Sequence, residues 1–456
     1  MTPNNECLME MNKLLPKMLK FGEILMTMEP EKQIHNDKVG AMKAKDANVN
    51  DTAFLCGYFS IDGKILSNIT KGKSPDSLKE WTPLHYSGQQ IALLSNFYYP
   101  EFVEFCTEVR QSYSLRVNRQ VSIPAGGDER CSFRVEDIRF GIYPYDIVMF
   151  SIRIEFADTD LDKLLSVLSR LRNCCFYDGA GLDEFISVCI DPLKRLYCVL
   201  TGCETAPDAN SLVENGNKLK LFHIVESGDL SDEFLYSCAT LSRYEPDSPF
   251  SASREYFEKT IAESRLNIFN NWKALMLLDT VTFCAKELSE FTKGIWTNDY
   301  FGMIYLYELY RKTYLYRQNL LFRSRRESPE VLHEQLKYFE RKYTFSSISY
   351  NFLPNDVDKV IEQGLGTAKV ERDVYRVIDQ EVESKSAERE SRSNVFLTFL
   401  TCVASFSAVW DISCMVDAMV NYEVAFHYST VGYRAVVSVL IAIILIVLLI
   451  TRYKKK

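Results

Sequence analysis

The sequence predicts an α+β domain, a helical region and a long stalk helix that leads into two closely spaced membrane spans at the C-terminal end. Three observations support this fold class. Residues 435–450 form a charge-free run of Val, Ile, Leu, Ala and Ser, the composition of a membrane-crossing helix. Residues 52–246 alternate apolar and polar side chains as strands do. From Ser251 onward, apolar side chains recur every three or four positions, which is the helical period.

The second span is predicted at residues 432–451, about 20 residues or about 30 Å of helix, which matches one hydrocarbon core. The chain then ends in three lysines, Lys454 to Lys456. The alternative is a buried core helix, but such helices rarely lack a polar face and rarely end in a lysine cluster.

The first span is predicted at residues 393–410, which carry no charged side chain. Its small polar side chains fall within an arc of about 80° on a helix that turns about 100° per residue. They are Asn394, Thr398, Thr401 and Ser405. Because hydroxyl and amide groups facing lipid would be unsatisfied, the stripe indicates a water-filled pore. The alternative is tight helix packing through small residues.

Charge predicts the orientation of this hairpin. The intervening loop, residues 411–434, carries Asp411, Asp417 and Glu423 against Arg434 alone. The flanks on the other side are basic, with Lys385, Arg389, Arg392, Arg452 and the three terminal lysines. The positive-inside rule therefore predicts a multi-pass protein of the inner (plasma) membrane, surrounded by lipid, with both termini in the cytoplasm.

Two sets of carboxylates are predicted to form rings around a symmetry axis. Asp411, Asp417 and Glu423 would concentrate cations at the outer mouth and favour cation selectivity, unless they only solvate an exposed loop. Glu383 and Glu390 lie within about 40° of the polar stripe and would point to the axis on the inner side. The alternative is that these two glutamates form ordinary charge pairs on a solvated helix flank.

Composition and motifs exclude several classes of function. The 456 residues carry a net charge of −8, which provides no overall basic field for direct nucleic-acid binding. Thirteen cysteines without CxxC pairs indicate reduced cytosolic thiols, and the N-terminal residues build no apolar signal-peptide core. The five histidines are isolated, and HExxH, GxSxG and GxxxxGK[ST] are absent. The sequence therefore predicts that the protein is not an enzyme.

The predicted organisation has four parts. Residues 1–51 hold an amphipathic helix (7–28) and a mobile connector (29–51). Residues 52–246 form the α+β domain, with a hairpin around Asp62-Gly63, strands across 119–158, a helix at 161–173 and further strands at 185–190, 194–202 and 218–227. Residues 247–393 hold helices at 251–271, 272–291, 299–326 and 328–343 and the stalk, and residues 394–456 form the membrane hairpin with its basic tail.

The stalk helix is predicted to run from Asp356 through Gly364 and Gly366 into the first span, with residues 367–410 alone about 66 Å long. Its few apolar positions are Val370, Val374, Val377 and Ile378. Because they are too few for a core within one chain, copies of the same helix are the predicted partners.

This order of elements resembles the CorA family of divalent cation channels and transporters, most closely over residues 251–456. The resemblance implies a homo-oligomeric funnel of five subunits that conducts ions and binds divalent cations such as Mg²⁺. The chain departs from the family at the end of the first span. Where members that move Mg²⁺ have Gly-Met-Asn, this chain has Trp410-Asp411-Ile412 and then Cys414-Met415-Val416.

The chain also resembles the CorA-like membrane effectors that accompany type III CRISPR systems. That resemblance implies an antiviral role and a small nucleotide ligand, such as an adenylated S-adenosylmethionine, that opens the channel. The Tyr-rich segment 300–316 and the arginines after it suit adenine stacking and phosphate pairing. These are Arg317, Arg323, Arg325 and Arg326. The alternatives are core packing for the tyrosines and, for the protein, a tail-anchored scaffold or sensor that conducts no ions.

Overall fold

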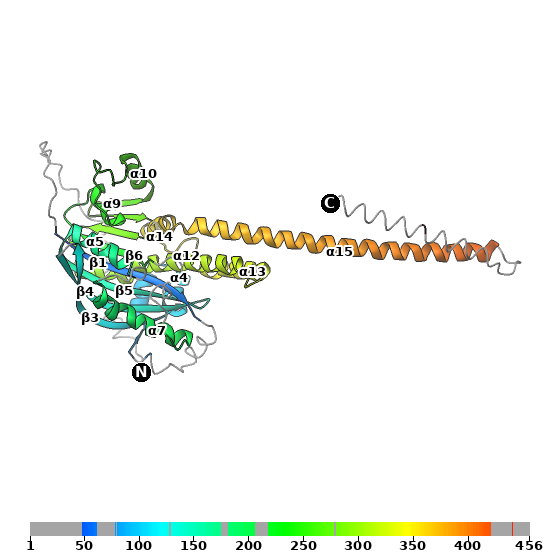
Figure 1. Cartoon of the computed structure of the whole chain (residues 1–456), viewed down its shortest axis with the longest axis horizontal. Helices are drawn as coiled ribbons and strands as arrows, with labels where there is room; N and C mark the ends of the chain where they lie inside the picture. Colours follow the sequence, from blue (N-terminus) through cyan, green and yellow to red (C-terminus); the bar gives the residue numbers. More distant parts are fainter. Residues whose placement is uncertain are drawn as a thin grey trace, which may run out of the picture. The chain divides into compact units, whose positions relative to one another are not determined.

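The computed structural model describes residues 48–61, 78, 80–126, 129–174, 181–205, 218–277, 280–420 and 440, all within one unit, Asp46–Lys456. These residues build a nine-stranded sheet with the order β2-β3-β4-β5-β1-β6-β9-β8-β7 (Figure 1). The strands are β1 (Asn48–Ser60), β2 (Thr82–Leu84), β3 (Gln111–Gly126), β4 (Glu129–Tyr143), β5 (Ile147–Asp160), β6 (Lys220–Glu226), β7 (Arg265–Phe269), β8 (Trp272–Leu277) and β9 (Thr280–Ala285). The predicted α+β domain is confirmed.

Neighbouring strands in the described sheet are antiparallel except for β6 and β9, which run parallel with Leu221 beside Thr280. A parallel pair needs a long crossover, which here contains two helices and the strands β7 and β8. The sheet therefore continues across residue 246, and strands from both sides of that position share one core.

One face of the sheet is covered by helices from the first half of the chain and from the crossover. They are α5 (Leu161–Arg172), α6 (Asp183–Phe185), the π-helical segment η3 (Ile186–Ile190), α7 (Asp191–Thr201), α9 (Asp232–Thr240) and α10 (Arg254–Ser264). In α5 the Asp160 side chain caps the helix by accepting from the Lys163 N–H at 3.1 Å, and Leu164, Leu168 and Leu171 lie fully buried on one side.

The opposite face carries the second helical layer. It consists of α3 (Gly88–Ser95), α4 (Pro100–Glu104), the π-helical segment η2 (Phe105–Val109), α11 (Glu290–Asn298), α12 (Phe301–Arg323), α13 (Pro329–Tyr343), α14 (Phe352–Leu365) and the first part of α15 (Thr367–Val420). A Cβ atom at Gly302 would lie 1.9 Å from the carbonyl oxygen of Thr297. Only glycine therefore lets α12 begin directly against the end of α11.

Two segments predicted as strands are helical. Residues 185–190 belong to α6 and η3, and residues 194–201 belong to α7. The β-rich composition of the second segment was misleading, because Leu193, Leu196 and Leu200 recur at helical spacing and all three are buried. Pro192 in the first turn and Gly202 with φ of 72° after the last turn mark the two ends of α7.

The reverse error concerns residues 265–285. The helices predicted at 251–271 and 272–291 are replaced by α10 followed by three strands, β7 to β9. Every residue of β9 is buried, so its apolar side chains cover both faces and leave no alternation to read. The β-branched residues Thr280, Val281 and Thr282 were the signal for a strand.

The stalk differs from the prediction at both ends. Gly366 adopts φ of 70°, closes α14 and separates it from α15, so the helix does not run through from Asp356. At the other end, α15 extends to Val420, 54 residues in all, and residues 411–420 are helical where a loop was predicted. The prediction of one continuous helix over 367–410 is confirmed.

The apolar positions of the stalk pack within the chain. Val374 and Ile378 are 3% and 1% exposed and belong to the same core as α12, α13 and α14, whereas Val377 remains exposed. The inference that these positions need neighbouring copies is therefore wrong for Val374 and Ile378, which the chain's own helical layer covers.

Several predictions lie outside the described residues. They are the helix at 7–28, residues 29–47 of the connector, the turn at Asp62-Gly63, Glu423, the basic tail and the span at 432–451 apart from Leu440. The last four residues of the predicted connector, 48–51, begin β1.

Candidate functional site

Helix α15 combines two environments in one continuous element (Figure 1). Its first part is packed in the second helical layer, where the Tyr375 hydroxyl donates to the Leu336 carbonyl at 3.0 Å. Its later part contains a segment long and apolar enough to cross a membrane by length and composition, and none of that segment is buried. Large exposed apolar surfaces on a protein mark interaction with lipid or with another protein. The exposed side chains include Phe396, Leu397, Phe399, Leu400, Val403, Trp410 and Ile412.

The predicted pore residues all lie on this segment, but two of them differ from the expectation. The Thr398 hydroxyl donates to the Asn394 carbonyl at 2.7 Å, and the Thr401 hydroxyl donates to the Leu397 carbonyl at 2.8 Å. Both hydroxyls are therefore satisfied by their own helix and need neither water nor a partner helix. Of the predicted stripe, the Asn394 amide and the Ser405 hydroxyl remain as the polar groups that would need water or a partner helix inside a membrane.

The predicted acidic positions are spread along α15. Glu383 and Glu390 are exposed on the part before the apolar segment, and Asp411 is exposed at its end. The backbone at Asp417 is helical. One chain does not bring these carboxylates together, so the predicted rings require further copies.

The arginines predicted to bind a ligand line neither of the two best-formed cavities of the described chain. Arg317 donates to the Tyr145 carbonyl, Arg323 donates to the Asn319 side chain at 3.1 Å, and the next two arginines are exposed in the turn after α12. The tyrosines before them are core residues at 1% exposure or less. They are Tyr305, Tyr307, Tyr310 and Tyr314.

A buried charged cluster joins α15 to the rest of the domain. The Arg311 guanidinium on α12 donates to Glu308 at 2.7 Å, to Glu362 of α14 at 3.1 Å and to Glu371 of α15 at 3.2 Å. Arg311 is 4% exposed and Glu308 is fully buried. We call Glu308, Arg311, Asp358, Glu362 and Glu371 the Arg311 cluster. It places one cation among four carboxyl groups at the base of the stalk.

The excess of carboxyl groups makes the cluster sensitive to protonation. Burial raises the pKa of Glu308 to about 7, although the Arg311 charge opposes the shift. Burial, with the nearby Glu308 carboxyl, also raises the pKa of Asp358 well above its usual value, and burial raises that of Glu371. Protons on these acids relieve repulsion that a single arginine cannot offset.

We expect the stability of the folded domain to fall as the pH rises from about 5 to about 7.5. In this range native Glu308 keeps a proton that the unfolded chain, with a pKa of 4.5, has already released, so the native state binds more protons and loses stability with rising pH. Glu308→Gln should flatten this fall by about 1–3 kcal/mol, measured by denaturation of the full chain in nanodiscs at several pH values. Glu334→Gln, an exposed change on α13, is the control, and an equal pH slope in all three proteins would contradict the prediction.

A cavity of about 300 Å³ lies between the sheet and the start of α12. Its floor is formed by strands β1, β3, β4, β5 and β6, and the other walls by α3, the end of α11 and α12. Aromatic rings line much of it, including Tyr86, Tyr143, Phe54, Phe222 and Tyr305. Phe222 and Tyr305 stack with their ring centres 5.5 Å apart. We call this space the Arg110 cavity after its most unusual side chain.

Arg110 follows η2 and precedes β3, and its guanidinium is positioned by two phenols. It donates to the Tyr86 hydroxyl at 2.9 Å and to the Tyr143 hydroxyl at 3.4 Å. Its Nε is buried without a hydrogen-bond partner, and among the described residues Arg110 forms no ion pair with a carboxylate. Because burial raises the pKa of Tyr86 and of Tyr143, both phenols stay neutral at physiological pH. The two phenols therefore leave the Arg110 charge unneutralised.

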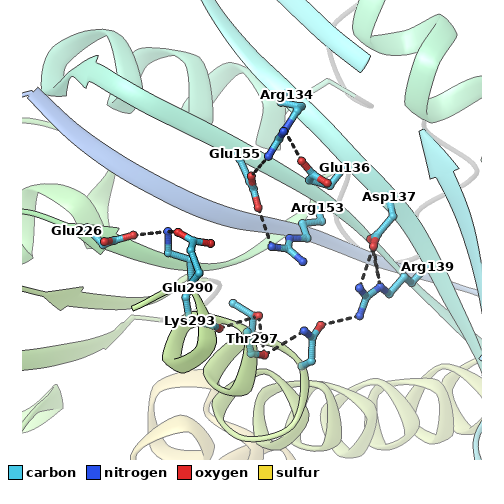
Figure 2. Close-up of polar contacts among 12 residues, drawn as sticks. Arg134, Glu136, Asp137, Arg139, Arg153, Glu155, Glu226, Glu290, Lys293 and Thr297 are labelled. Carbon is cyan, nitrogen blue, oxygen red and sulfur yellow. Dashed lines mark hydrogen bonds and ion pairs between the residues drawn. The ribbon is translucent and has the colours of Figure 1, made fainter. Parts of the chain in front are cut away.

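The other charged groups of the cavity come from β4 and α11. Figure 2 shows Arg139 paired with Asp137, and their shortest contact is 2.8 Å. Arg139 also donates to the Asn298 side chain at 2.7 Å. Asp299 follows Asn298 and lines the cavity, and burial raises the pKa of its carboxyl while Arg139 and Arg110 oppose the shift. In the described chain no side chain donates a hydrogen bond to the Asp299 carboxyl.

Figure 2 also shows further ion pairs on the sheet and between the sheet and α11. Glu155 on β5 accepts from Arg134 and from Arg153, each at 2.6 Å, and Lys293 of α11 pairs with Glu226 of β6. The Lys293–Glu226 pair ties α11 to the sheet, and the end of that helix carries Asn298 and Asp299.

A second polar group crosses the centre of the sheet. His223 on β6 lies 3.0 Å from Asp51 of β1 and 2.8 Å from the Thr282 hydroxyl of β9. An acid, a histidine and a hydroxyl in this order form a nucleophile triad in hydrolases. Here all three side chains are at most 2% exposed, and none lines the cavities found in the described residues. The contacts join three strands and offer no access to a substrate.

Neither the Arg311 cluster nor the Arg110 cavity was predicted from the sequence. Their members are separated by tens to hundreds of positions, from Phe54 to Leu306 for the cavity, and no local spacing links them. The only indication of them in the sequence was the presence of charged residues inside apolar segments, such as Glu308 and Arg311 in the Tyr-rich helix.

The fold and these sites define an α+β protein with one described helix that meets the length and composition of a membrane span. No family model, curated protein or solved structure matches the chain.

Proposed function

We propose that this protein is a subunit of a cation-selective membrane channel that resembles the CorA-like channels and is opened by a small nucleotide ligand. The observation that carries the proposal is the continuity of α15, which has one part packed in the folded domain and another part that is apolar and not buried. A stiff helix transmits a displacement at its base to its far end, as a flexible linker would not.

The Arg311 cluster supports the proposal because it lies where the domain and the stalk meet. A change in the position of α12 or α14 acts on Glu371 through Arg311 and therefore on α15. A ligand opens such a channel only if it binds the open form more tightly than the closed form.

A single span encloses no pore, so the proposal requires several copies around an axis, five by the family resemblance. In such an assembly Asn394 and Ser405 would face the pore, and the threonines would lie beside them with satisfied hydroxyls. Carboxylate rings at Asp411, Asp417 and Glu423 outside, and at Glu383 and Glu390 inside, would attract cations. Antiviral defence is the role that the resemblance implies for such a channel.

The test is ion flux through the purified chain in liposomes. Under a KCl gradient we expect a reversal potential close to that of K⁺, and the combined variant Asp411→Asn, Asp417→Asn and Glu423→Gln should shift it at least halfway to zero. A matched control replaces three exposed carboxylates of the folded domain, Glu255, Glu258 and Glu263, by glutamine. No flux with or without nucleotides would exclude the channel and leave a membrane-anchored scaffold or sensor.

A further inference from the structure

We propose that the Arg110 cavity binds a small anion that carries a flat, hydrogen-bond-donating ring, the chemistry of a nucleoside monophosphate. This inference extends the proposed function by assigning the ligand to a place other than the arginines at the end of α12. It concerns binding and does not require that the protein conducts ions.

The anionic end of the ligand is indicated by Arg110. The Nε–H of this half-buried guanidinium is buried without a hydrogen-bond partner, and its other partners are neutral phenols, so the group is left with unused capacity to pair with an anion. A phosphate or carboxylate pairs with two guanidinium N–H groups at once and corrects both deficits.

A glycine on the neighbouring strand, Gly141, lies directly against the Arg110 side chain and the Tyr143 ring. A Cβ at Gly141 would lie 3.2 Å from the Arg110 side chain and 3.0 Å from the Tyr143 ring. A methyl group at position 141 would therefore crowd both the Arg110 side chain and the Tyr143 ring.

The flat part of the ligand is indicated by the aromatic walls and by Asp299. Rings such as Phe54, Phe222 and Tyr305 offer faces and edges to a planar group. The Asp299 carboxyl receives no hydrogen bond from the described side chains, and it suits an amino or imino group of a heterocycle. The volume of about 300 Å³ lies at the lower end of the range for small-molecule sites.

The arrangement of the cavity connects this site to the stalk. Leu306 and Tyr305 line the cavity on α12, and Glu308 and Arg311 lie one turn further along the same helix. A ligand that moves the start of α12 therefore acts on the Arg311 cluster and on α15.

The test is calorimetric titration of the full chain in nanodiscs with AMP, GMP, CMP and UMP. Adenosine and inorganic phosphate, which each carry only one part of a nucleotide, are titrated as half-ligands. We expect at least one nucleotide to bind at one site per chain, at least tenfold more tightly than either half-ligand. Arg110→Met should weaken it by about 10- to 100-fold and Asp299→Asn by about tenfold. Arg323→Met, at the end of α12, should have no effect.

A second variant tests the site if Arg110→Met does not fold. If Arg110→Met does not retain the circular dichroism of the parent, Gly141→Ala tests the same contact without removing a charge, and it should also weaken binding by at least tenfold. Failure of all four nucleotides to bind would overturn the inference, as would binding that is unchanged by both variants or lost in Arg323→Met. Nucleotide binding without ion flux would support the binding site and exclude the channel. Ion flux without nucleotide binding would support the channel and exclude the binding site.

Discussion

Replacing Arg311 by methionine is expected to destabilise the folded domain by about 3–5 kcal/mol, a large fraction of the stability of an ordinary domain. Methionine fills similar volume but leaves Glu308, Glu362 and Glu371 without the guanidinium to which all three are hydrogen-bonded. The measurement is chemical denaturation of the full chain in nanodiscs, followed by circular dichroism at pH 7.5.

The matched control is Arg376→Met on α15. Arg376 pairs with Asp373 at 2.9 Å, but the two side chains are 64% and 53% exposed, so its loss should change stability by no more than about 0.5 kcal/mol. At pH 5 Glu308 and Glu371, whose pKa values are raised, are more protonated, and the cost of Arg311→Met should be smaller than at pH 7.5. Equal stability of the two variants would show that the cluster does not hold the stalk to the domain.

Cys414 is expected to react from outside the cell with a membrane-impermeant maleimide. The thiol lies on α15 just beyond the apolar segment, and its side chain is exposed. If the folded domain is cytoplasmic and the helix crosses the membrane, this position emerges on the far side. The measurement is labelling of intact cells, with Cys414→Ser as the variant that should abolish the signal.

Leu400→Arg provides the decisive comparison, because it places a charge near the middle of the apolar segment. On biological insertion scales the change from Leu to Arg disfavours insertion by about 3–4 kcal/mol, enough to reduce Cys414 labelling several-fold. Ser391→Arg, before the apolar segment, should leave labelling unchanged. Labelling that persists in Cys414→Ser, or that is equal in Leu400→Arg and its parent, would contradict a membrane crossing by α15.

Local patterns predicted the elements whose residues are contiguous and half-buried. The Ser328-Pro329 start of α13 was readable because the Ser328 hydroxyl accepts from the Val331 N–H, a contact three residues away. Strands β8 and β9 were not predicted, because burial on both faces removes the alternation of apolar and polar residues that distinguishes a strand from a helix. The break at Gly366 was missed because a glycine near the end of a helical pattern is compatible with either continuation or a cap.

The sequence by itself determined the α+β class, the continuous helix over 367–410 and the apolar segment within it, because each depends on neighbours along the chain. Only the tertiary structure decided what that helix is attached to and where a ligand has room. Arg311 is hydrogen-bonded to Glu371, 60 positions away in the sequence. Arg110, after η2, and Asp299, after α11, line the same cavity. Such contacts arise when strands and helices pack, and no spacing in the sequence encodes them.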